Sequence, residues 1–361
     1  MNKIRVLVID DSVLVRKILT EILTSSPEIE VIGTAADPLI AREMIKQLNP
    51  DVLTLDIEMP HMDGITFLRN LMRLRPTPVV MISTLTKKGA EVTLEALALG
   101  AVDFIFKPKV DVIKTLNDYA DEIIDKVKTA ARANVRNIDY RPVKTKDNES
   151  TVSQPAKSLV SHKTASSAKI IAIGASTGGT EAIKVVAKYL TAETPPVFIT
   201  QHLPAAFSDS FVKHIDLVTA MTALIPTHGQ VVEDGHIYLA PGDKHMLVTK
   251  EAGRFYIHLS DAEPVNRHKP AVDVLFNSIA QCAGSNAIAI LLTGMGADGA
   301  AGMKEMKNAG AITIIQDEQT SVVWGMPGAA YKLGCVDYVM PIEEVANKIL
   351  SLSKLAHQKG A

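Results

Sequence analysis

Short apolar runs that alternate with helix-length amphipathic segments restrict the fold of this chain more than any other feature. In the first third of the sequence, strand-sized runs occupy residues 4–9, 31–35, 51–56, 78–83 and 102–106. The segment 13–25 between the first two carries apolar residues at helical spacing. Strands that alternate with helices predict a parallel sheet covered by helices on both faces. We therefore expect residues 1–128 to form a doubly wound α/β domain.

The same alternation stops and then restarts further along the chain. Residues 129–168 are polar, contain Pro, Ser, Thr and Lys, and show no periodicity, which predicts a flexible linker. From residue 169 to residue 361, strand-like runs again alternate with helical segments; the runs are 170–175, 196–201, 287–294 and 311–316. Between them, residues 235–242, 245–251 and 254–260 look like hairpin strands joined by Gly and Pro turns. We predict a second, mostly parallel α/β domain with an antiparallel insert.

Composition excludes several classes of protein. With 361 residues and 47% hydrophobic residues the chain can build two cores, and 4% aromatic residues predict that these cores are aliphatic. A net charge of −2 disfavours nucleic-acid binding through a basic face. No apolar run reaches the ~18 residues of a membrane span, and acidic residues interrupt the N-terminal run too early for a signal peptide. Cys282 and Cys335 lie far apart, as expected of reduced thiols in a cytoplasmic protein.

Charged and hydroxyl side chains follow the predicted strands of the first domain. Asp10 and Asp11 come after the first strand, and Asp56, Ser83 and Lys107 end the third, fourth and fifth strands. The carboxyl ends of parallel strands meet at one edge of a sheet. Three carboxylates beside one ammonium suit Mg²⁺, and one of them is placed to become an aspartyl phosphate. The alternative reading, that each Asp only caps a helix, fits Asp11 but not the whole set.

These motifs resemble the receiver domain of two-component response regulators. VLVIDDS, DVLTLDIEMPHMDG, MIST and DFIFKP occupy the family's positions in order across the whole segment. The resemblance implies a flavodoxin-like domain of five parallel strands in which a histidine kinase phosphorylates Asp56. It also implies a Mg²⁺ site and a switch; the site would be formed by Asp10, Asp11, Asp56 and the Glu58 backbone carbonyl, and the switch by Ser83, Phe104 and Lys107. Phe104 also fits a core aromatic position.

In the second domain, the stretch IIAIGASTGGTEAI (170–183) poses a choice between a phosphate loop and a nucleophile turn. It lacks the Lys followed by Ser or Thr of a Walker loop, and its glycines lack dinucleotide-binding spacing. Gly174, Ser176 and Gly178 match G-x-S-x-G between a strand and a helix. Small neighbours permit a sharp turn that exposes the Ser176 hydroxyl. Because this short pattern also arises by chance, the prediction of a nucleophile depends on finding a base.

Two further residues complete a candidate triad. His202 directly follows the strand after the Ser176 helix, at the same sheet edge, and Asp298 follows the apolar run 287–294. Alternatively, His202 is a surface-loop histidine and Asp298 the N-cap of the next helix, although capping and orienting are compatible. His245 and His268, near the insert, are candidates to line a pocket. The order Ser, His, Asp differs from that of α/β-hydrolases.

Together these segments resemble the CheB family, the chemotaxis response-regulator protein-glutamate methylesterases. IGASTGG, ITQHLPAAFSDSF, APGDKHM, RHKPAVDVLFNSIA and LLTGMGADGAAG stand in family order. The resemblance implies that Ser176 is the nucleophile, His202 the base and then acid, and Asp298 the group that orients His202. Backbone N–H groups near Thr177 and Met295 would form the oxyanion site. The implied substrates are methylated glutamates of methyl-accepting chemotaxis receptors, with methanol released, and receptor glutamines; the esterase reaction needs no cofactor.

The two resemblances together predict a phosphorylation-activated enzyme. We expect the unphosphorylated receiver to block the Ser176 cleft, and phosphorylation of Asp56 to favour an open form. We also expect a monomer that binds no nucleic acid and does not insert into membranes. One alternative is a second domain that only docks on a partner. Another is a regulator that acts on DNA, which the absence of a basic recognition helix disfavours.

Overall fold

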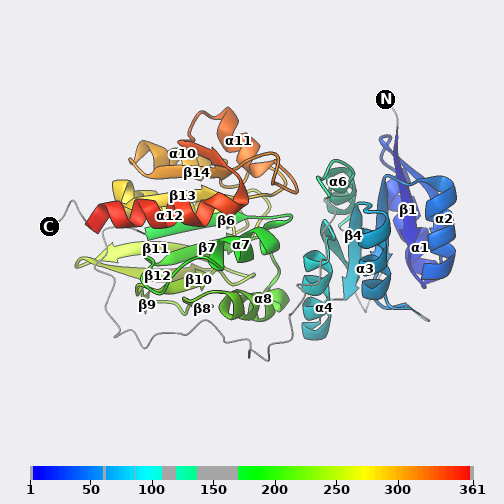
Figure 1. Cartoon of the computed structure of the whole chain (residues 1–361), viewed down its shortest axis with the longest axis horizontal. Coiled ribbons are helices and arrows are strands. Elements are labelled where there is room, and N and C mark those ends of the chain that lie inside the picture. The colour runs from blue at the N-terminus through cyan, green and yellow to red at the C-terminus, as the bar shows by residue number, and fades with distance from the viewer. Residues whose placement is uncertain (1–2, 60–61, 85, 108–118, 136–169, 358–361) are drawn as a thin grey trace, which may run out of the picture. The chain divides into compact units, whose positions relative to one another are not determined.

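A computed structural model of the chain describes residues 3–59, 62–84, 86–107, 119–135 and 170–357. They fall into two compact units, Met1–Asn148 and Glu149–Ala361, each of which has its own sheet and core (Figure 1). Most of the predicted linker, residues 136–168, lies outside the described residues. The predicted domain limits stay predictions, with one local correction: helix α6 runs to Ala131, so residues 129–131 are helical.

The first unit is the predicted doubly wound domain. Its strands are β1 (Ile4–Ile9), β2 (Ile29–Ala35), β3 (Val52–Asp56), β4 (Val79–Thr84) and β5 (Asp103–Lys107). They pair in the order β2-β1-β3-β4-β5, and every pair is parallel. This is the flavodoxin-like order, and the direction of winding reverses between β1 and β3. The five-stranded parallel sheet predicted from sequence is confirmed.

Five described helices cover this sheet: α1 (Val13–Thr24), α2 (Pro38–Leu48), α3 (Gly64–Leu74), α4 (Lys87–Ala98) and α6 (Ala120–Ala131). The side chains of Ser12, Asp37, Asp63 and Thr86 accept backbone N–H bonds and so begin the first four of them. α1 contacts α6, and α3 contacts α4. Right-handed crossovers place these two pairs on opposite faces of the sheet.

The second unit is built on a seven-stranded parallel sheet. Its strands pair in the order β15-β14-β13-β6-β7-β10-β8, with β6 (Ile170–Ala175), β7 (Val197–Gln201), β8 (Thr222–Leu224), β10 (His236–Leu239), β13 (Ala287–Leu291), β14 (Ile312–Gln316) and β15 (Tyr338–Met340). Winding reverses between β6 and β13, because β6 leads to β7 on one side and β13 leads to β14 on the other. The residues that follow β6 and β13 therefore lie at a topological switch point, where open α/β sheets bind ligands.

Helices cover both faces of this larger sheet. They are α7 (Gly179–Ala187), α8 (Ala205–Val218), α9 (Val272–Ala283), α10 (Ala300–Asn308), α11 (Met326–Lys332) and α12 (Ile342–His357). α7 contacts α8 and α12, whereas α10 contacts α9 and α11. No helix in the described part of the chain is long and apolar enough to cross a membrane.

The antiparallel insert is confirmed, but one strand assigned to it was wrong. The insert consists of β9 (Gln230–Val231), β11 (His245–Glu251) and β12 (Arg254–Ser260), which pair antiparallel and pack through β11 on α9. The run 235–242 was predicted to join this hairpin. Instead its strand β10 lies parallel between β7 and β8 in the large sheet. A run of only four residues carries no signal that distinguishes the two settings.

The prediction of aliphatic cores is only partly correct. The core strands of both sheets are mainly Val, Ile, Leu and Ala, all buried. The largest fully buried side chains are nevertheless the aromatic residues of the second unit, Tyr238, Phe198, Phe207, Phe211 and Phe276. Phe198 stacks on Tyr238 at a centroid distance of 5.5 Å. The few aromatic residues of the chain are thus concentrated where they fill the larger core.

Candidate active site

At the switch point of the first sheet, the predicted acidic residues meet the predicted lysine. Lys107 Nζ lies 3.0 Å from Asp10 Oδ2 and 2.8 Å from Asp56 Oδ2. One oxygen each from Asp10, Asp11 and Asp56 all fall within 4.8 Å of one another. Asp10 and Asp56 are buried, whereas Asp11 is exposed. The structure therefore brings together residues from three strand ends that lie almost 100 positions apart, since Lys107 follows Asp10 by 97.

Burial shifts the pKa values of the carboxylates in this acidic cluster. Burial and then the neighbouring charge of Asp10 raise the pKa of Asp56 to about 6. Burial likewise raises the pKa of Asp10. Burial opposes the charge on Lys107, but its hydrogen bond to Asp56 and the charges of both carboxylates outweigh burial and raise its pKa. One ammonium thus faces several carboxylates, and the remaining negative charge favours a bound cation.

The donor set of the cluster fits Mg²⁺, which prefers carboxylate and carbonyl oxygens. Three carboxylates converge, and two of them are buried with raised pKa values that a divalent cation would lower. The segment after β3 stays close, because the Glu58 N–H lies 3.4 Å from Asp56 Oδ1. The predicted use of the Glu58 carbonyl as a ligand remains a prediction.

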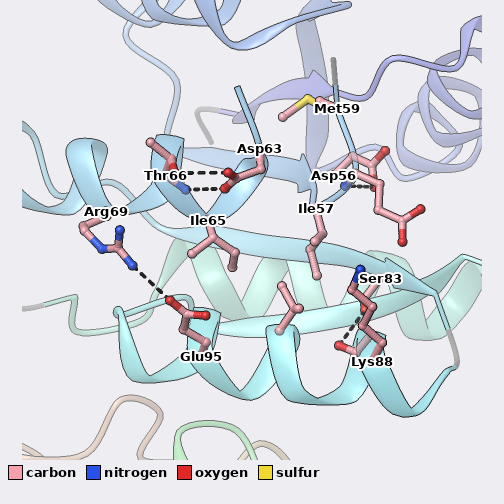
Figure 2. A pocket seen from close by; sticks show the side chains of 13 residues that line it. Asp56, Ile57, Met59, Asp63, Ile65, Thr66, Arg69, Ser83, Lys88 and Glu95 are labelled. Atoms are coloured by element: carbon pink, nitrogen blue, oxygen red, sulfur yellow. Dashed lines mark hydrogen bonds and ion pairs between the residues drawn. The ribbon is translucent and has the colours of Figure 1, made fainter. Parts of the chain in front are cut away.

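A pocket of about 530 Å³ opens beside Asp56 and is lined by residues of β3, β4, α3 and α4. Figure 2 shows Asp56 and Ser83 toward one end of this pocket and the ion pair between Arg69 and Glu95 toward the other. Ser83 is buried and accepts a hydrogen bond from Thr93 Oγ1 at 2.6 Å. Ser83 is therefore held at the Asp56 end of this pocket.

Phe104, the predicted switch aromatic, is a buried side chain of β5. It is only 5% exposed and meets Phe106 edge-on at a centroid distance of 5.2 Å. Lys126 Nζ lies 5.0 Å from its ring centre. This packing agrees with the alternative of a core aromatic, and a role for Phe104 in switching remains a prediction.

In the second unit, Ser176 sits in the turn between β6 and α7. Gly178 has a φ of 78°, and a Cβ there would come within 2.7 Å of Val322 Cβ. The Gly179 N–H donates to the Ser176 carbonyl at 2.7 Å and closes the turn. In the part of the chain that the structure describes, the hydrogen bonds of Ser176 are made by its backbone. Its hydroxyl is therefore uncommitted, as a nucleophile requires.

The strand end of β13 passes directly beside this turn. The Ser176 N–H donates to the Thr293 carbonyl at 3.0 Å. A Cβ on Gly294 would come within 2.8 Å of Ser176 Cβ and 2.3 Å of Met326 Sδ. Only a residue without a side chain permits this approach, so Gly294 sets how near the segment 294–298 comes to Ser176.

His202 lies on the other side of the same turn. The last register pair of β6 and β7 is Ala175 with Gln201, so Ser176 and His202 each follow a paired strand residue. The His202 N–H also donates to the Ala175 carbonyl at 3.2 Å. The side chain is 7% exposed, so the alternative of a surface-loop histidine is wrong. Nε2 lies 2.8 Å from Asp298 Oδ2, and Nδ1 is buried without a hydrogen-bond partner among the described residues.

The carboxylate of Asp298 accepts four hydrogen bonds. Oδ2 receives His202 Nε2 at 2.8 Å and the Val272 N–H at 2.6 Å, and Oδ1 receives Asn266 Nδ2 at 2.9 Å and the Asp273 N–H at 3.2 Å. Burial alone would raise its pKa, but His202 and the other donors outweigh burial and lower the pKa to about 2. Asp298 is therefore a fixed anion that can hold a proton on His202 Nε2.

Asp298 does cap a helix, but the prediction of which helix was wrong. It accepts the N–H groups of Val272 and Asp273, at the start of α9. The helix that follows it, α10, has Gly299 at its N-cap and no side-chain cap. Asp273 provides the side-chain cap of α10 instead, because its Oδ1 accepts the Gly302 N–H at 2.6 Å. Asp298, just before α10, thus caps α9, and Asp273, in the first turn of α9, caps α10. No local pattern in the sequence indicates this exchange of caps.

The structure also brings Asn266 and Gln201 to the site, which the sequence did not assign. Asn266 reaches Asp298. His268, a candidate pocket residue, stacks its ring on His202 at a centroid distance of 3.7 Å. Gln201 Nε2 donates to the Ser176 carbonyl at 2.9 Å. His245, a candidate pocket residue, is instead buried, with both ring nitrogens bonded to backbone atoms. The tolerance of Asn for turns was the one available signal for Asn266.

Two predicted oxyanion residues flank the Ser176 turn. Thr177 is buried, and its carbonyl accepts the Thr293 hydroxyl at 2.9 Å. Met295 is half-buried and directly follows Gly294. Thr177 thus lies in the turn after β6 and Met295 in the loop after β13, and their role in stabilising an oxyanion remains a prediction.

Comparisons with known proteins match both units. A family model described as CheB methylesterase matches residues 171–349, and one described as response regulator receiver domain matches residues 6–117. The protein-glutamate methylesterase/protein-glutamine glutaminase of Hydrogenovibrio crunogenus is 53% identical, over 98% of this chain and 100% of its own length. Protein-glutamate methylesterase/protein-glutamine glutaminase 1 of Xanthomonas campestris is 54% identical, over 98% of each chain.

A solved structure resembles the second unit. The crystal structure of the Thermotoga maritima CheB methylesterase catalytic domain is 34% identical and aligns with a TM-score of 0.50. The alignment covers 51% of this chain and 98% of that domain. The likeness therefore extends over the fold that carries Ser176, His202 and Asp298.

Proposed function

The chain belongs to the CheB methylesterase family, and on that premise we propose that it is a phosphorylation-activated protein-glutamate methylesterase and protein-glutamine glutaminase. Ser176, His202 and Asp298 are the proposed catalytic triad. The observation that carries this proposal is the buried hydrogen bond between His202 and Asp298, on a strand end that adjoins the uncommitted Ser176 hydroxyl. The proposed substrates are glutamate methyl esters and glutamines of methyl-accepting chemotaxis receptors.

The proposed base is His202 Nδ1. Asp298 stays ionised at neutral pH, because its pKa is about 2, and it accepts the proton of Nε2. A neutral imidazole that carries its proton on Nε2 has its lone pair on Nδ1. This nitrogen is buried and has no hydrogen-bond partner in the described part of the chain, so its lone pair is placed to accept the Ser176 proton. The two nitrogens are used in the opposite sense to the serine-protease template, in which Nδ1 faces the carboxylate.

The reaction proceeds through an acyl-enzyme. Ser176 Oγ attacks the ester carbonyl carbon while its proton passes to His202 Nδ1, which gives a tetrahedral oxyanion. Backbone N–H groups near Thr177 and Met295, with the N-terminus of α7, stabilise this charge. The carbon–oxygen bond to the methoxy group then breaks, and His202 returns the proton so that methanol leaves. Water repeats the attack, releases glutamate and restores Ser176. With a glutamine substrate the same sequence releases ammonia.

The first unit controls this reaction through Asp56. We propose that a chemotaxis histidine kinase supplies the phosphoryl group, and that Asp10, Asp11, Asp56 and the Glu58 carbonyl hold Mg²⁺. The cation would offset negative charge on the phosphoryl oxygens. Lys107 would do the same, since its Nζ already lies 2.8 Å from Asp56 Oδ2. Ser83 and Phe104 would couple the modified Asp56 to a change of shape, and the absence of a cofactor in the esterase reaction remains a prediction.

Methanol release tests the proposal. Purified protein is incubated with methyl-labelled chemotaxis receptor, with and without a small phosphodonor, and volatile label is followed. We expect release by the wild type, faster with the phosphodonor, and a loss of about 10⁶-fold in Ser176→Ala. Ser285→Ala, on an exposed serine after α9, is the matched control with wild-type release. Normal release by Ser176→Ala would refute the assignment of the nucleophile.

A further inference from the structure

The loop before α9 contains a tight turn in an unusual backbone conformation. The N–H of Val265 donates to the His268 carbonyl at 3.0 Å, and the N–H of His268 donates back at 2.9 Å. The two residues between them are in the left-handed region, Asn266 with a φ of 53° and Arg267 with a φ of 68°. Asn adopts this region more readily than most residues, so the turn presents the Asn266 side chain in a defined direction.

The Asn266 amide joins two buried carboxylates. Its Nδ2 donates to Asp298 Oδ1 at 2.9 Å and to Asp273 Oδ2 at 2.8 Å. These are the two carboxylates that exchange caps between α9 and α10. Burial raises the pKa of Asp273, and the neighbouring charge of Asp298 raises it further. A shared amide with two hydrogens satisfies both carboxylates and fixes the plane of Asp298.

The other end of the turn carries His268, whose ring packs on the imidazole of His202. The rings of His268 and His202 stack at a centroid distance of 3.7 Å, with 11° between their planes. The loop that carries His268 is fastened on both sides by His245, whose Nε2 bonds the Glu263 carbonyl and whose Nδ1 accepts the Ala271 N–H. Because His245 is buried, the stacking ring stands on a fixed support.

We propose that Asn266 and His268 are positioning residues for the His202–Asp298 pair, an inference that rests on the proposed function. The Asn266 amide stops rotation of the Asp298 carboxylate, so that Oδ2 continues to face His202 Nε2. The His268 ring stops the His202 ring from swinging out of the plane in which Nδ1 can receive a proton. Both act through another side chain and not on the substrate, so they affect kcat and leave KM unchanged.

Substitutions at Asn266 separate amide donation from turn formation. Gly and Asp both tolerate the left-handed conformation, but neither provides the amide donor. We expect kcat for methanol release to fall about 10²-fold in Asn266→Gly, with KM within about twofold, since small misplacements of catalytic groups cost that much. Asn266→Asp should fall further, because it adds a third carboxylate. Arg267→Gly, in the same turn, is the matched control and keeps wild-type kcat.

The competing explanation is a purely structural turn. On that explanation, Asn266→Gly and Asn266→Asp retain kcat within about threefold of the wild type, and such a result would overturn the proposal for Asn266. Thermal melting of each full-length variant is recorded in parallel. If Asn266→Gly melts early, Asn266→Asp measured well below its own melting temperature gives the same decision.

Substitutions at His268 test the stack. His268→Phe keeps a flat ring, and His268→Ala removes it. We expect Phe to retain kcat within about threefold and Ala to lose about tenfold, the scale of one aromatic contact. Loss in both variants, or in neither, would overturn the stacking role. Should the Ala variant unfold, His268→Leu replaces it, because Leu fills the space without a flat ring and should lose kcat about tenfold; unchanged kcat in His268→Leu would overturn the stacking role.

Ser176→Ala is assayed beside these variants. Suppose that Ser176→Ala is inactive and the wild type is active. If the Asn266 and His268 variants then keep wild-type kcat, only this inference fails. If Ser176→Ala remains active, the proposed function fails first.

Discussion

Asp56 and Asp298 occupy equivalent places in the two units and behave in opposite ways. Both are buried near the switch point of a parallel sheet; Asp56 is the last residue of β3, and Asp298 lies in the loop after β13. The pKa of Asp56 is raised to about 6, whereas the pKa of Asp298 is lowered to about 2. Asp56 shares one lysine with Asp10, while Asp298 receives four hydrogen-bond donors. The difference lies in the supply of donors and not in burial.

This difference decides what each carboxylate can do. A carboxylate with saturated oxygens cannot attack a substrate, but it can hold a histidine in one protonation state and orientation. A buried carboxylate with too few donors gains from a cation and a phosphoryl group, which complete its surroundings. A buried carboxylate near a strand end is therefore suited to orient a histidine in the second unit and to accept a phosphoryl group in the first.

The largest effect is expected at Asp298. Asp298→Asn keeps the shape of the side chain but replaces one carboxylate oxygen by an NH₂ group, which faces groups that themselves donate hydrogen bonds. It should favour the wrong tautomer of His202 and lower kcat about 10⁴-fold. Asp337→Asn is a matched control, since Asp337 accepts backbone and side-chain bonds of Thr313 on β14 and touches none of the triad. Turnover of methyl-labelled receptor measures both.

A smaller effect is expected where β13 approaches the nucleophile. In Gly294→Ala the new Cβ would meet Ser176 and Met326, so the turn must shift by several tenths of an ångström. We expect kcat to fall about 10²-fold. Gly296→Ala makes the control, because Gly296 has a φ of 81° but open space around its Cβ position. That variant should lose stability, about 1 kcal/mol by thermal melting, with little change in kcat. Equal activities would contradict the packing argument.

At Asp56 the expected effect is the loss of regulation. Asp56→Asn should keep the unstimulated rate of methanol release and lose the stimulation by a small phosphodonor, which for coupled sites is typically about 5–150-fold. The rate is compared with and without phosphodonor in wild type and variant. Persistent stimulation in Asp56→Asn would mean that another residue accepts the phosphoryl group. Asp63→Asn, on the N-cap of α3, is the matched control with normal stimulation.

The smallest predicted effect is the pH dependence of Asp56 itself. A raised pKa means that the neutral form is favoured in the folded protein, so ionisation costs stability as pH rises from about 4 to 6. Between pH 7 and pH 5 the ionised fraction should fall about tenfold. Carbon-13 NMR of the carboxyl group in magnesium-free protein should give a midpoint near 6, and added Mg²⁺ should lower it. A midpoint near 4 without the cation would contradict the account.

The sequence predicts both sheets and the positions of the reactive residues on them, because strand ends are fixed by apolar periodicity. Asp10, Asp56 and Lys107 meet as expected, and His202 and Asp298 form the expected pair. Periodicity does not report strand direction in short runs, so residues 236–239 were assigned to the wrong sheet. The two switch points follow once strand order is known.

Contacts between distant loops lay beyond sequence reasoning. The capping of α9 by Asp298 joins residues 25 and 26 positions apart, and the bond from Asn266 to Asp298 spans 32. Such partners depend on how α9 and α10 pack, which residue type alone does not specify. Likewise, the stack of His268 on His202 depends on a turn whose backbone conformation is visible only in three dimensions.

Covalent labelling shows whether Ser176 is a nucleophile activated by His202. Full-length protein is treated with a fluorophosphonate, and the labelled peptide is identified and its rate of formation measured by mass spectrometry. We expect one rapid adduct on Ser176 that forms far more slowly in His202→Ala and is absent from Ser176→Ala. An adduct on another serine, or an unchanged labelling rate in His202→Ala, would contradict this assignment.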